Sequence, residues 1–206
     1  MRELDLGGGL SVSRETWDRL DHYTDLLNKW NPKINLVSPS TLAEAWTRHI
    51  VDSAQIWSIP QEYPQHWADL GAGGGFPGLV IAILRDEFAP GMRVTLVESD
   101  QRKCAFLRTV LRETGVEATV EARRIEEIPP LGADLLSARA LASLDKLLGF
   151  ADRHMCKNGS ALFPKGVQAE KEIAEARKMW QFDLERHTSL TDPHAVVLQI
   201  GALTHV

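Results

Sequence analysis

Cysteine is scarce in this chain, with two residues, Cys104 and Cys156, among 206. They form no Cys-x-x-Cys pair. A chain of this length buries roughly 70% of its unfolded surface, so its core needs neither disulfide nor metal for support. We therefore expect two buried thiols, both in helical segments, in a reducing compartment.

Long apolar runs are missing as well. Runs such as Leu79 to Leu84 fall far short of the roughly 20 residues that a bilayer span requires. The N-terminal segment shows no basic-then-apolar signal for export. The sequence therefore predicts a cytoplasmic protein without a membrane segment.

Basic residues are outnumbered, 23 against 28 acidic ones, which gives a net charge of −5. This balance argues against a protein that coats nucleic acid non-specifically. The charge is uneven, because residues 101–124 contain six basic and three acidic side chains. A localised basic face is therefore compatible with the acidic total.

The first 60 residues are patterned as helices. Apolar residues recur three and four apart from Trp17 to Trp30, which predicts an amphipathic helix that ends at Asn31-Pro32. A second helix is predicted to start at the capping box Thr41-x-x-Glu44 and to end before Pro60. We interpret residues 1–60 as a helical extension packed on a domain of residues 61–206.

Beyond residue 64, short apolar strands alternate with helical stretches, a pattern typical of βαβ units and a parallel sheet. Strands are predicted near residues 66–70, 93–98, 117–122, 133–137 and 160–164, with a closing antiparallel pair at 180–187 and 195–201. Helices are predicted at residues 100–114, 143–154 and 167–179. The expected fold is a doubly wound, Rossmann-like α/β domain with seven mostly parallel strands and helices on both faces.

A glycine-rich loop follows the first predicted strand, with the sequence Asp69-Leu-Gly71-Ala-Gly73-Gly-Gly75-Phe-Pro77-Gly78. Glycine lets the backbone approach a ligand that a Cβ would block. Pro77 suits the first position of the next helix, and the following strand ends on the acidic Glu98. The sequence therefore predicts a cofactor site at this loop.

Two cofactors fit the loop. Gly73-x-Gly75-x-x-Gly78 satisfies the dinucleotide fingerprint, and Glu98 follows 20 residues later, which suits a nicotinamide-dependent oxidoreductase. However, the carboxylate of Asp69 at the strand end would repel a pyrophosphate. The order Asp-x-Gly-x-Gly-x-Gly instead resembles the first motif of class I methyltransferases, whose cofactor S-adenosyl-L-methionine carries an ammonium and a sulfonium. A non-catalytic RNA- or nucleotide-binding module is a third interpretation.

Further motifs share one order and spacing between residues 29 and 166. They are Lys29-Trp30-Asn31 with Asn35-Leu36-Val37-Ser38, Arg48-His49-Ile50-Val51-Asp52-Ser53, Gly71 to Gly78, Ser137-Ala138-Arg139-Ala140 with Ala142-Ser143-Leu144, and Pro164-Lys165-Gly166. Together they resemble the bacterial 16S ribosomal RNA guanine-N7 methyltransferases, also called glucose-inhibited division protein B. Ala138 is an extra residue relative to the family's pattern.

This resemblance implies methyl transfer from S-adenosyl-L-methionine to N7 of one guanine in the decoding-region loop of 16S ribosomal RNA. The substrate would be that RNA or the small ribosomal subunit, and the enzyme would act as a monomer. Glu98 would bind the two ribose hydroxyls. The implied cofactor contacts are Asp69, Gly71, Gly73, Phe76, Glu98, Ile125, Glu126 and Arg139.

Arg139 and Lys165 are the predicted catalytic residues. N7 of guanine carries a lone pair and no proton, so its methylation needs no general base and depends on positioning. Arg139, at the end of the fourth predicted strand, could bind guanine O6, an RNA phosphate or the cofactor carboxylate, or form a structural ion pair. Lys165, after the fifth strand, could bind phosphate or O6, or be an ordinary loop lysine.

The second predicted helix offers two interpretations. Arg48 and Asp52 are four residues apart, which favours a salt bridge within the helix and His49 against the core. Alternatively, this helix forms a wall of the RNA site, with Asn35, Arg48 and His49 contacting RNA. No second ligand stands at a metal-like interval from His49, so no metal is expected.

Overall fold

A seven-stranded sheet lies at the centre of the computed structural model, which describes residues 4–5 and 9–206. The strand order is β5-β4-β3-β6-β7-β9-β8, and β9 alone runs opposite to the direction that the other six strands share. The strands are β3 (His66–Leu70), β4 (Arg93–Val97), β5 (Thr119–Glu121), β6 (Ala133–Ser137), β7 (Met155–Lys165), β8 (Trp180–Thr188) and β9 (Val196–His205), with a separate ribbon of β1 (Leu4–Asp5) and β2 (Ser11–Val12). The predicted α/β fold is confirmed.

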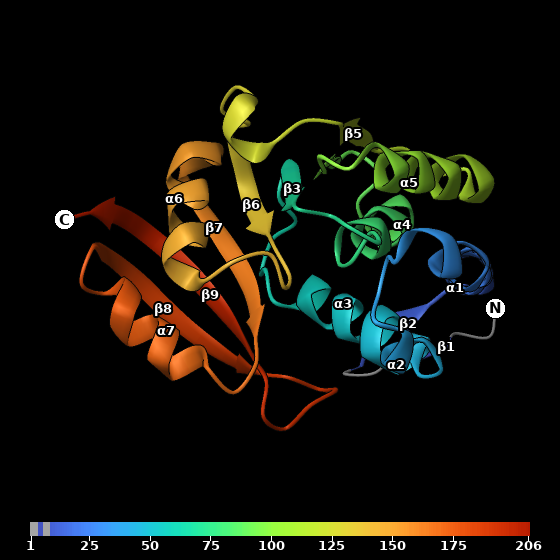
Figure 1. Cartoon of the computed structure of the whole chain (residues 1–206), viewed down its shortest axis with the longest axis horizontal. Coiled ribbons are helices and arrows are strands. Elements are labelled where there is room, and N and C mark those ends of the chain that lie inside the picture. The colour runs from blue at the N-terminus through green and yellow to red at the C-terminus, as the bar shows by residue number, and fades with distance from the viewer. Residues whose placement is uncertain (1–3, 6–8) are drawn as a thin grey trace.

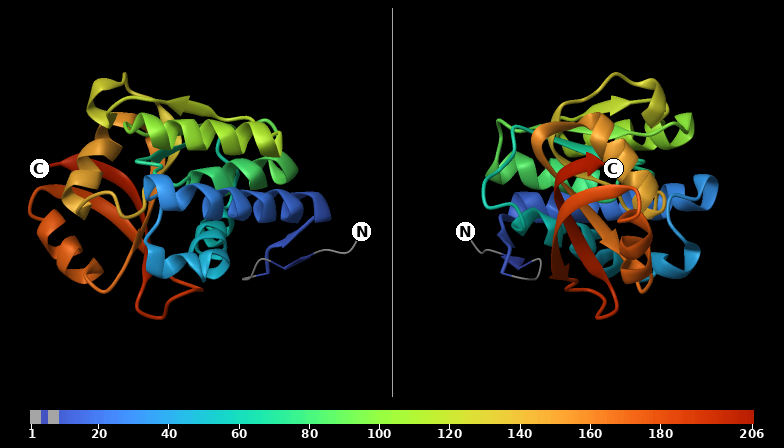
Figure 2. Two further views of the ribbon diagram at one scale, coloured as in Figure 1. Left: turned by 45° about the vertical axis from the view of Figure 1, so that its right-hand side comes forward. Right: turned by 90° about the vertical axis from the view of Figure 1, so that its left-hand side faces the viewer.

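Helices cover both faces of the sheet (Figure 1). On one face lie α4 and α5, with α1 packed against both, and on the other lie α6 and α7 (Figure 2). The helices are α1 (Arg14–Ile34), α2 (Pro39–Leu42), the π-helix η1 (Trp46–Val51), α3 (Asp52–Ala54), the 3-10 helix η2 (Gln55–Ser58), α4 (Gly78–Phe88), α5 (Gln101–Thr114), the 3-10 helix η3 (Ile125–Glu127), α6 (Leu144–His154) and α7 (Ala169–Ala176). No helix in the described part of the chain is long and apolar enough to cross a membrane.

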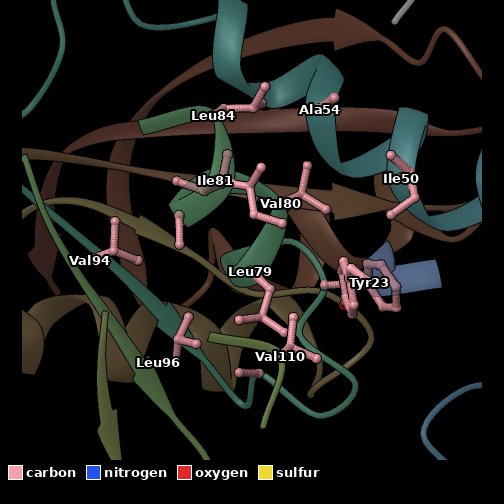
Figure 3. Close-up of a cluster of buried hydrophobic side chains, with 14 of the residues drawn as sticks. Tyr23, Ile50, Ala54, Leu79, Val80, Ile81, Leu84, Val94, Leu96 and Val110 are labelled. Atoms are coloured by element: carbon pink, nitrogen blue, oxygen red, sulfur yellow. The ribbon is translucent and has the colours of Figure 1, made fainter. Parts of the chain in front are cut away.

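Strand alternation divides the core into two clusters. Successive side chains of a strand point to opposite faces, so Trp67 of β3 joins the cluster under α4 and α5 while Ala68 and Leu70 join the cluster under α6 and α7. Tyr23 of α1 and Ile50 of η1 are buried in the first cluster (Figure 3). The N-terminal helices therefore share a core with the sheet.

The first helix extends further than predicted. It passes through Pro32 and ends at Ile34, because a proline in the last turn removes only one backbone donor. The buried amide oxygen of Asn31 then accepts hydrogen bonds from the backbone N–H groups of Leu36 and Val37 at 2.8 and 2.9 Å. This side chain turns the chain back toward the sheet after the helix.

The second predicted helix is wrong in its start and its continuity. Helix α2 begins after Ser38, with Pro39 at its first position, and Thr41 donates its hydroxyl to the Ser38 carbonyl instead of capping a helix. Residues 46–58 then form π, α and 3-10 turns in succession. A π-turn carries an extra residue, so the positions beyond it rotate away from the regular helical pattern.

One cysteine is placed differently from the prediction. Cys104 is buried in α5, as expected, and donates its Sγ–H to the carbonyl of Glu98. Cys156 is only half-buried and lies in β7, which begins at Met155, ahead of the predicted residue 160. The continuous apolar residues of this strand lie in its second half, so the sequence pattern predicted a strand only for residues 160–164.

Candidate active site

The loops at the carboxyl ends of β3, β4, β6 and β7 border a cavity of about 1240 Å³. This is the edge where open α/β sheets bind ligands, and the chain reverses its strand order there, between β3 and β6. Residues 36–55 and the loop of residues 189–195 between β8 and β9 complete the lining. Because pockets for one small molecule measure roughly 300–1,000 Å³, the cavity has room for more than a cofactor.

The glycine loop between β3 and α4 is shaped by backbone conformation and close packing. Gly71 and Gly73 have positive φ angles of 68° and 56°. A Cβ on Gly78 would collide with Leu96 Cδ2 and lie 2.6 Å from Asp69 Oδ2, so only glycine lets α4 pack this closely on the sheet. The buried hydroxyl of Tyr23 donates to the Gly74 carbonyl and supports the loop from below.

Glu98, at the end of β4, closes the other side of the loop. Its Oε2 accepts the Gly73 N–H at 2.9 Å and its Oε1 accepts the Asp100 N–H at 2.8 Å. It lines the cavity together with the apolar Ile125 and with Glu126 of η3. A carboxylate acceptor beside glycine backbone and an apolar side chain suits the ribose and base of an adenosine-containing cofactor.

Asp69 does not face the cavity, which corrects the expectation for its carboxylate. It is fully buried, and its oxygens accept hydrogen bonds from Ser137 Oγ at 2.7 Å and from the Gly78 N–H at 3.0 Å. Burial raises the pKa of Asp69 to about 7. Alternation along β3 turns this side chain, like that of Trp67, toward α4. Asp69 therefore pins the loop from below, and its position does not discriminate between cofactors.

Arg139 reaches back from the end of β6 to the N-terminal helices. Its Nη1 donates to Asp52 Oδ2 at 2.9 Å and to the Arg48 carbonyl at 3.2 Å, and its Nη2 donates to His49 Nδ1 at 3.0 Å. The guanidinium lies over the Phe76 ring, 5.1 Å from its centroid. Arg139 thus forms an ion pair with Asp52 while lining the cavity.

The salt bridge between Arg48 and Asp52, one of the two interpretations of this helix, is not formed. Asp52 pairs with Arg139, and the carboxylate near Arg48 is that of Asp192, at 4.0 Å. The wider turn of η1 separates residues that four-residue spacing would align on a regular helix. Arg48 remains on the cavity wall with a half-exposed side chain.

His49 is stacked on Phe76, with ring centroids 4.9 Å apart. Arg139 can only donate, so Nδ1 of His49 accepts and Nε2 carries the hydrogen toward Thr41 Oγ1, 2.9 Å away. Burial and the neighbouring guanidinium lower the pKa of His49 to about 4. The ring is therefore neutral at physiological pH, and both of its nitrogens are engaged.

Lys165 ends β7 and also lines the cavity. Its Nζ donates to Glu172 Oε2 at 2.7 Å and to the Ala142 carbonyl at 2.9 Å. The same Glu172 oxygen accepts the Leu144 N–H at 2.6 Å, which ties α7 to the start of α6. Lys165 is thus held by a partly buried ion pair rather than in an ordinary loop.

Asn35 lies apart from the other predicted residues. It takes the left-handed conformation, with φ 50°, at the end of α1 and is not part of the cavity lining, which begins at Leu36. Conversely, the sequence did not reveal the lining residues Gln55, Thr191 and Asp192. The polar composition of residues 189–195, between two apolar strands, was the one available signal for this loop.

No group of three histidine, cysteine, aspartate or glutamate side chains within residues 4–5 and 9–206 could hold a metal ion. The cavity lining instead combines glycine backbone, aromatic rings, carboxylates and cations. This composition suits a bound organic cofactor and a polar substrate.

Comparison with known proteins gives one consistent family. The family model described as GidB, rRNA small subunit methyltransferase G, matches residues 16–200. "Ribosomal RNA small subunit methyltransferase G" of Ruegeria sp. (strain TM1040) is 53% identical over 197 residues, covering 96% of each chain. The protein of the same name from Paramagnetospirillum magneticum is 50% identical over 189 residues, covering 92% of this chain and 90% of that protein.

Solved structures with low sequence identity share the fold. A methyltransferase from Geobacter sulfurreducens superposes with a TM-score of 0.60 at 15% identity and covers 98% of both chains. A T. thermophilus 16S rRNA methyltransferase (RsmC), in complex with AdoMet and guanosine, gives a TM-score of 0.52 at 15% identity, covering 73% of this chain and 38% of that one. At such identities the likeness concerns the fold alone.

Proposed function

The chain belongs to the GidB family, rRNA small subunit methyltransferase G, and on this premise we propose that it transfers a methyl group from S-adenosyl-L-methionine to N7 of a guanine in 16S ribosomal RNA. The observation that carries the proposal is the single cavity that joins the glycine loop and Glu98 to Arg139 and Lys165. One end of this cavity suits the cofactor. The other presents two cations to a nucleotide.

The residues of the first end fit the cofactor. Glu98 would accept hydrogen bonds from the ribose hydroxyls, and Ile125 would cover the base. The backbone of Gly71 and Gly73 would lie close to the cofactor, because these residues have no side chain. Phe76 is buried beneath the guanidinium of Arg139 and beside His49, so these rings would wall the methionine side. When bound, S-adenosyl-L-methionine supplies an electrophilic methyl group on a sulfonium.

The residues of the second end suit a reaction without proton abstraction. N7 of guanine is a lone-pair nucleophile, so the enzyme gains rate by alignment and exclusion of water. His49, with its pKa lowered to about 4 and both nitrogens engaged, is a poor proton acceptor at neutral pH. Arg139 and Lys165 would position the guanine through O6 or its phosphate.

RNA would approach through the cationic rim of the cavity. Lys103, Arg123 and Arg124 line it, together with Lys146 of α6, whose Nζ lies 4.0 Å from Glu126 Oε1. We infer a monomeric enzyme that works in the cytoplasm on 16S RNA, either naked or assembled in the small subunit. The local rim reconciles an acidic chain with an anionic substrate.

Two other functions were compatible with the sequence. The spacing of Gly73, Gly75 and Gly78 suits a dinucleotide as well, but the family assignment favours methyl transfer. A non-catalytic binding module would keep the cavity without turnover. Titration with NADH and with S-adenosylhomocysteine separates the first alternative, and an assay of turnover separates the second.

The decisive experiment supplies methyl-labelled S-adenosylmethionine and small ribosomal subunits from a strain lacking this methyltransferase. Digestion of the RNA should yield label in N7-methylguanosine at one site. Label in another nucleoside would show that the enzyme methylates a different atom from N7 of guanine. Binding of S-adenosylhomocysteine without any label would keep the cofactor but assign a different substrate. Naked 16S RNA run in parallel identifies the form of the substrate.

A further inference from the structure

We propose that Asp52 is a positioning residue that couples the loop of residues 189–195 to Arg139 and thereby fixes the wall of the cavity that receives the target guanine. The inference rests on the proposed function. It concerns a carboxylate that touches Arg139 on one side and Thr191 on the other, with both partners on the cavity wall.

The two oxygens of Asp52 bind different parts of the chain. Oδ2 accepts Arg139 Nη1 at 2.9 Å, and Oδ1 accepts the Thr191 hydroxyl at 2.6 Å. These partners are 87 and 139 residues away in sequence. Hydrogen bonds to a carboxylate are shorter and stronger than neutral ones. A single side chain therefore connects the end of β6 with the loop between β8 and β9.

A second contact from the same turn holds the loop. Gln55 donates Nε2 to Asp52 Oδ1 at 2.9 Å, and its Oε1 accepts the Leu190 N–H at 2.8 Å. The side chain of Leu190 itself is 58% exposed, so burial of apolar surface contributes little to holding this part of the loop. Figures 1 and 2 show the loop beside the helices of residues 39–58. Its position depends on polar contacts with Asp52 and Gln55 and on the ion pair between Asp192 and Arg48 at 4.0 Å.

The ion pair between Arg139 and Asp52 is partly shielded from solvent. The side chains of Arg139 and Asp52 are 17% and 19% exposed, so their attraction is screened less than that of a surface pair. Because Arg139 also lies on Phe76, a movement of Asp52 would change the place of the guanidinium over the glycine loop. The state of the loop is thereby transmitted to the residue that we expect to hold the guanine.

Thr191→Val tests the coupling with the smallest change, since valine keeps the side-chain shape and removes the hydroxyl donor. We expect the KM for the RNA substrate to rise about fivefold, while the Kd for S-adenosylhomocysteine stays within about twofold of the wild-type value. Thr191→Ser restores the hydroxyl and should return the KM. Thr204→Val, the same change on an exposed position of β9, is the matched control.

Asp52→Asn tests the other half of the connection. An asparagine is neutral and has one acceptor oxygen, so it cannot keep both the ion pair with Arg139 and the two hydrogen bonds that Oδ1 accepts from Thr191 and Gln55. We expect turnover to fall about 100-fold. The double variant Asp52→Asn/Thr191→Val should be no slower than Asp52→Asn alone, because the first change already breaks the connection. Multiplicative effects of the two changes would overturn the coupling.

Hydrogen–deuterium exchange gives a readout that does not depend on activity. The Leu190 amide, bonded to Gln55, should exchange about fivefold faster in Thr191→Val than in the wild type or in Thr204→Val. The inference would be refuted if Thr191→Val showed the wild-type exchange rate and the wild-type KM. It would also be refuted if the KM, the Kd for S-adenosylhomocysteine and the turnover number all worsened equally and the melting temperature fell, since that result indicates general destabilisation. A wild-type protein that methylates no RNA would refute the proposed function instead, and the exchange data would still decide the coupling.

Discussion

Arg139 illustrates how much of this site depends on geometry rather than charge. Its two terminal nitrogens meet a carboxylate, a carbonyl and an imidazole that all come from residues 48–52. A planar guanidinium serves these three acceptors from two separate nitrogens in a fixed geometry, which the single nitrogen of a lysine cannot reproduce. The residue therefore acts as a connector between the sheet and the N-terminal helices as well as a wall of the cavity.

Replacing Arg139 by lysine should separate shape from charge. Lysine keeps the positive charge but cannot reach Asp52, the Arg48 carbonyl and His49 together, so we expect single-turnover methylation to slow about 100-fold. The control is Arg112→Lys on the exposed end of α5, whose side chain is 71% exposed. A wild-type rate for Arg139→Lys would show that charge alone suffices.

His49 should make the folded state sensitive to acid. Its pKa is lowered from 6.5 to about 4 in the folded state. Between these two values the unfolded chain protonates His49 while the folded chain leaves it neutral, so protons favour unfolding. The contribution of His49 to the unfolding free energy is therefore complete above pH 6.5 and is lost as the pH falls. Between about pH 7 and about pH 4 the wild type should lose about 1–3 kcal/mol more unfolding free energy than His49→Gln, because solvent screens part of the effect.

Denaturant unfolding at several pH values measures this difference, with the exposed His22→Gln as the control. Asp69 acts in the opposite sense. Its pKa is raised from 3.8 to about 7, so the folded state keeps the proton that the unfolded chain loses. The contribution of Asp69 to the unfolding free energy therefore declines as the pH rises from about 4 to about 7. The comparison of His49→Gln with the wild type cancels this second effect, and parallel pH profiles in the two proteins would contradict the first.

At the scale of elements, the glycine loop is a junction between α1, β3, α4 and β4. Tyr23 supports it through Gly74, Asp69 holds Gly78, and Glu98 holds Gly73. Each of these bonds comes from a different element. The conformation of the cofactor loop is therefore a property of the packed domain rather than of its glycines alone.

Gly78→Ala should show the cost of disturbing this junction. The new Cβ would collide with Leu96 and Asp69, so we expect a loss of about 1–3 kcal/mol in unfolding free energy and weaker binding of S-adenosylhomocysteine. Gly91→Ala meets no atom within 4 Å and serves as the matched control. Calorimetric melting with and without ligand measures both quantities, and equal melting temperatures for the two variants would contradict the prediction.

Tyr23→Phe removes the hydroxyl under the loop and leaves the buried Gly74 carbonyl without its donor. An unsatisfied buried acceptor costs about 1–3 kcal/mol. We therefore expect a lower melting temperature and a Kd for S-adenosylhomocysteine raised several-fold. Tyr63→Phe, on a half-exposed tyrosine away from the loop, provides the comparison. An unchanged Kd would show that α1 does not influence the cofactor loop.

Regular elements were predictable from the sequence because alternation and helical spacing reflect the two faces of the sheet. The segment 38–58 was not, since a π-turn follows no standard period. The pairing of Asp52 with Arg139 joins residues 87 apart in sequence, which no local spacing encodes. The glycine loop and Glu98 line one cavity, and their role in binding a cofactor stays a prediction. The direction of the Asp69 side chain depends on how β3 sits between its neighbours.

For the whole molecule, the uneven distribution of charge decides how an acidic protein meets RNA. The net charge is −5, yet three basic side chains from residues 103–124 line the cavity. Repulsion from the rest of the surface would disfavour binding in other orientations. We therefore expect the charge pattern to orient the RNA toward the cavity.

RNA affinity should fall with salt in proportion to the phosphates neutralised. Arg124→Ala should weaken binding and reduce the slope of log K against log salt by about 1. Arg14→Ala changes an exposed arginine that does not line the cavity and should leave the slope unchanged. Filter binding of 16S RNA over a salt series measures the slope. Equal slopes in both variants would show that Arg124 does not contact an RNA phosphate.

The antiparallel strand β9 has a consequence for how the protein is made. It follows β8 in the chain but lies between β7 and β8 in the sheet, so β8 has no docking site until β9 has been synthesised. The loop that carries Thr191 joins these two strands and is fixed only when both are seated. A nascent chain halted before β9 lacks the seated loop that contacts Asp52, and we expect this contact to form only after β9 has left the ribosomal exit tunnel.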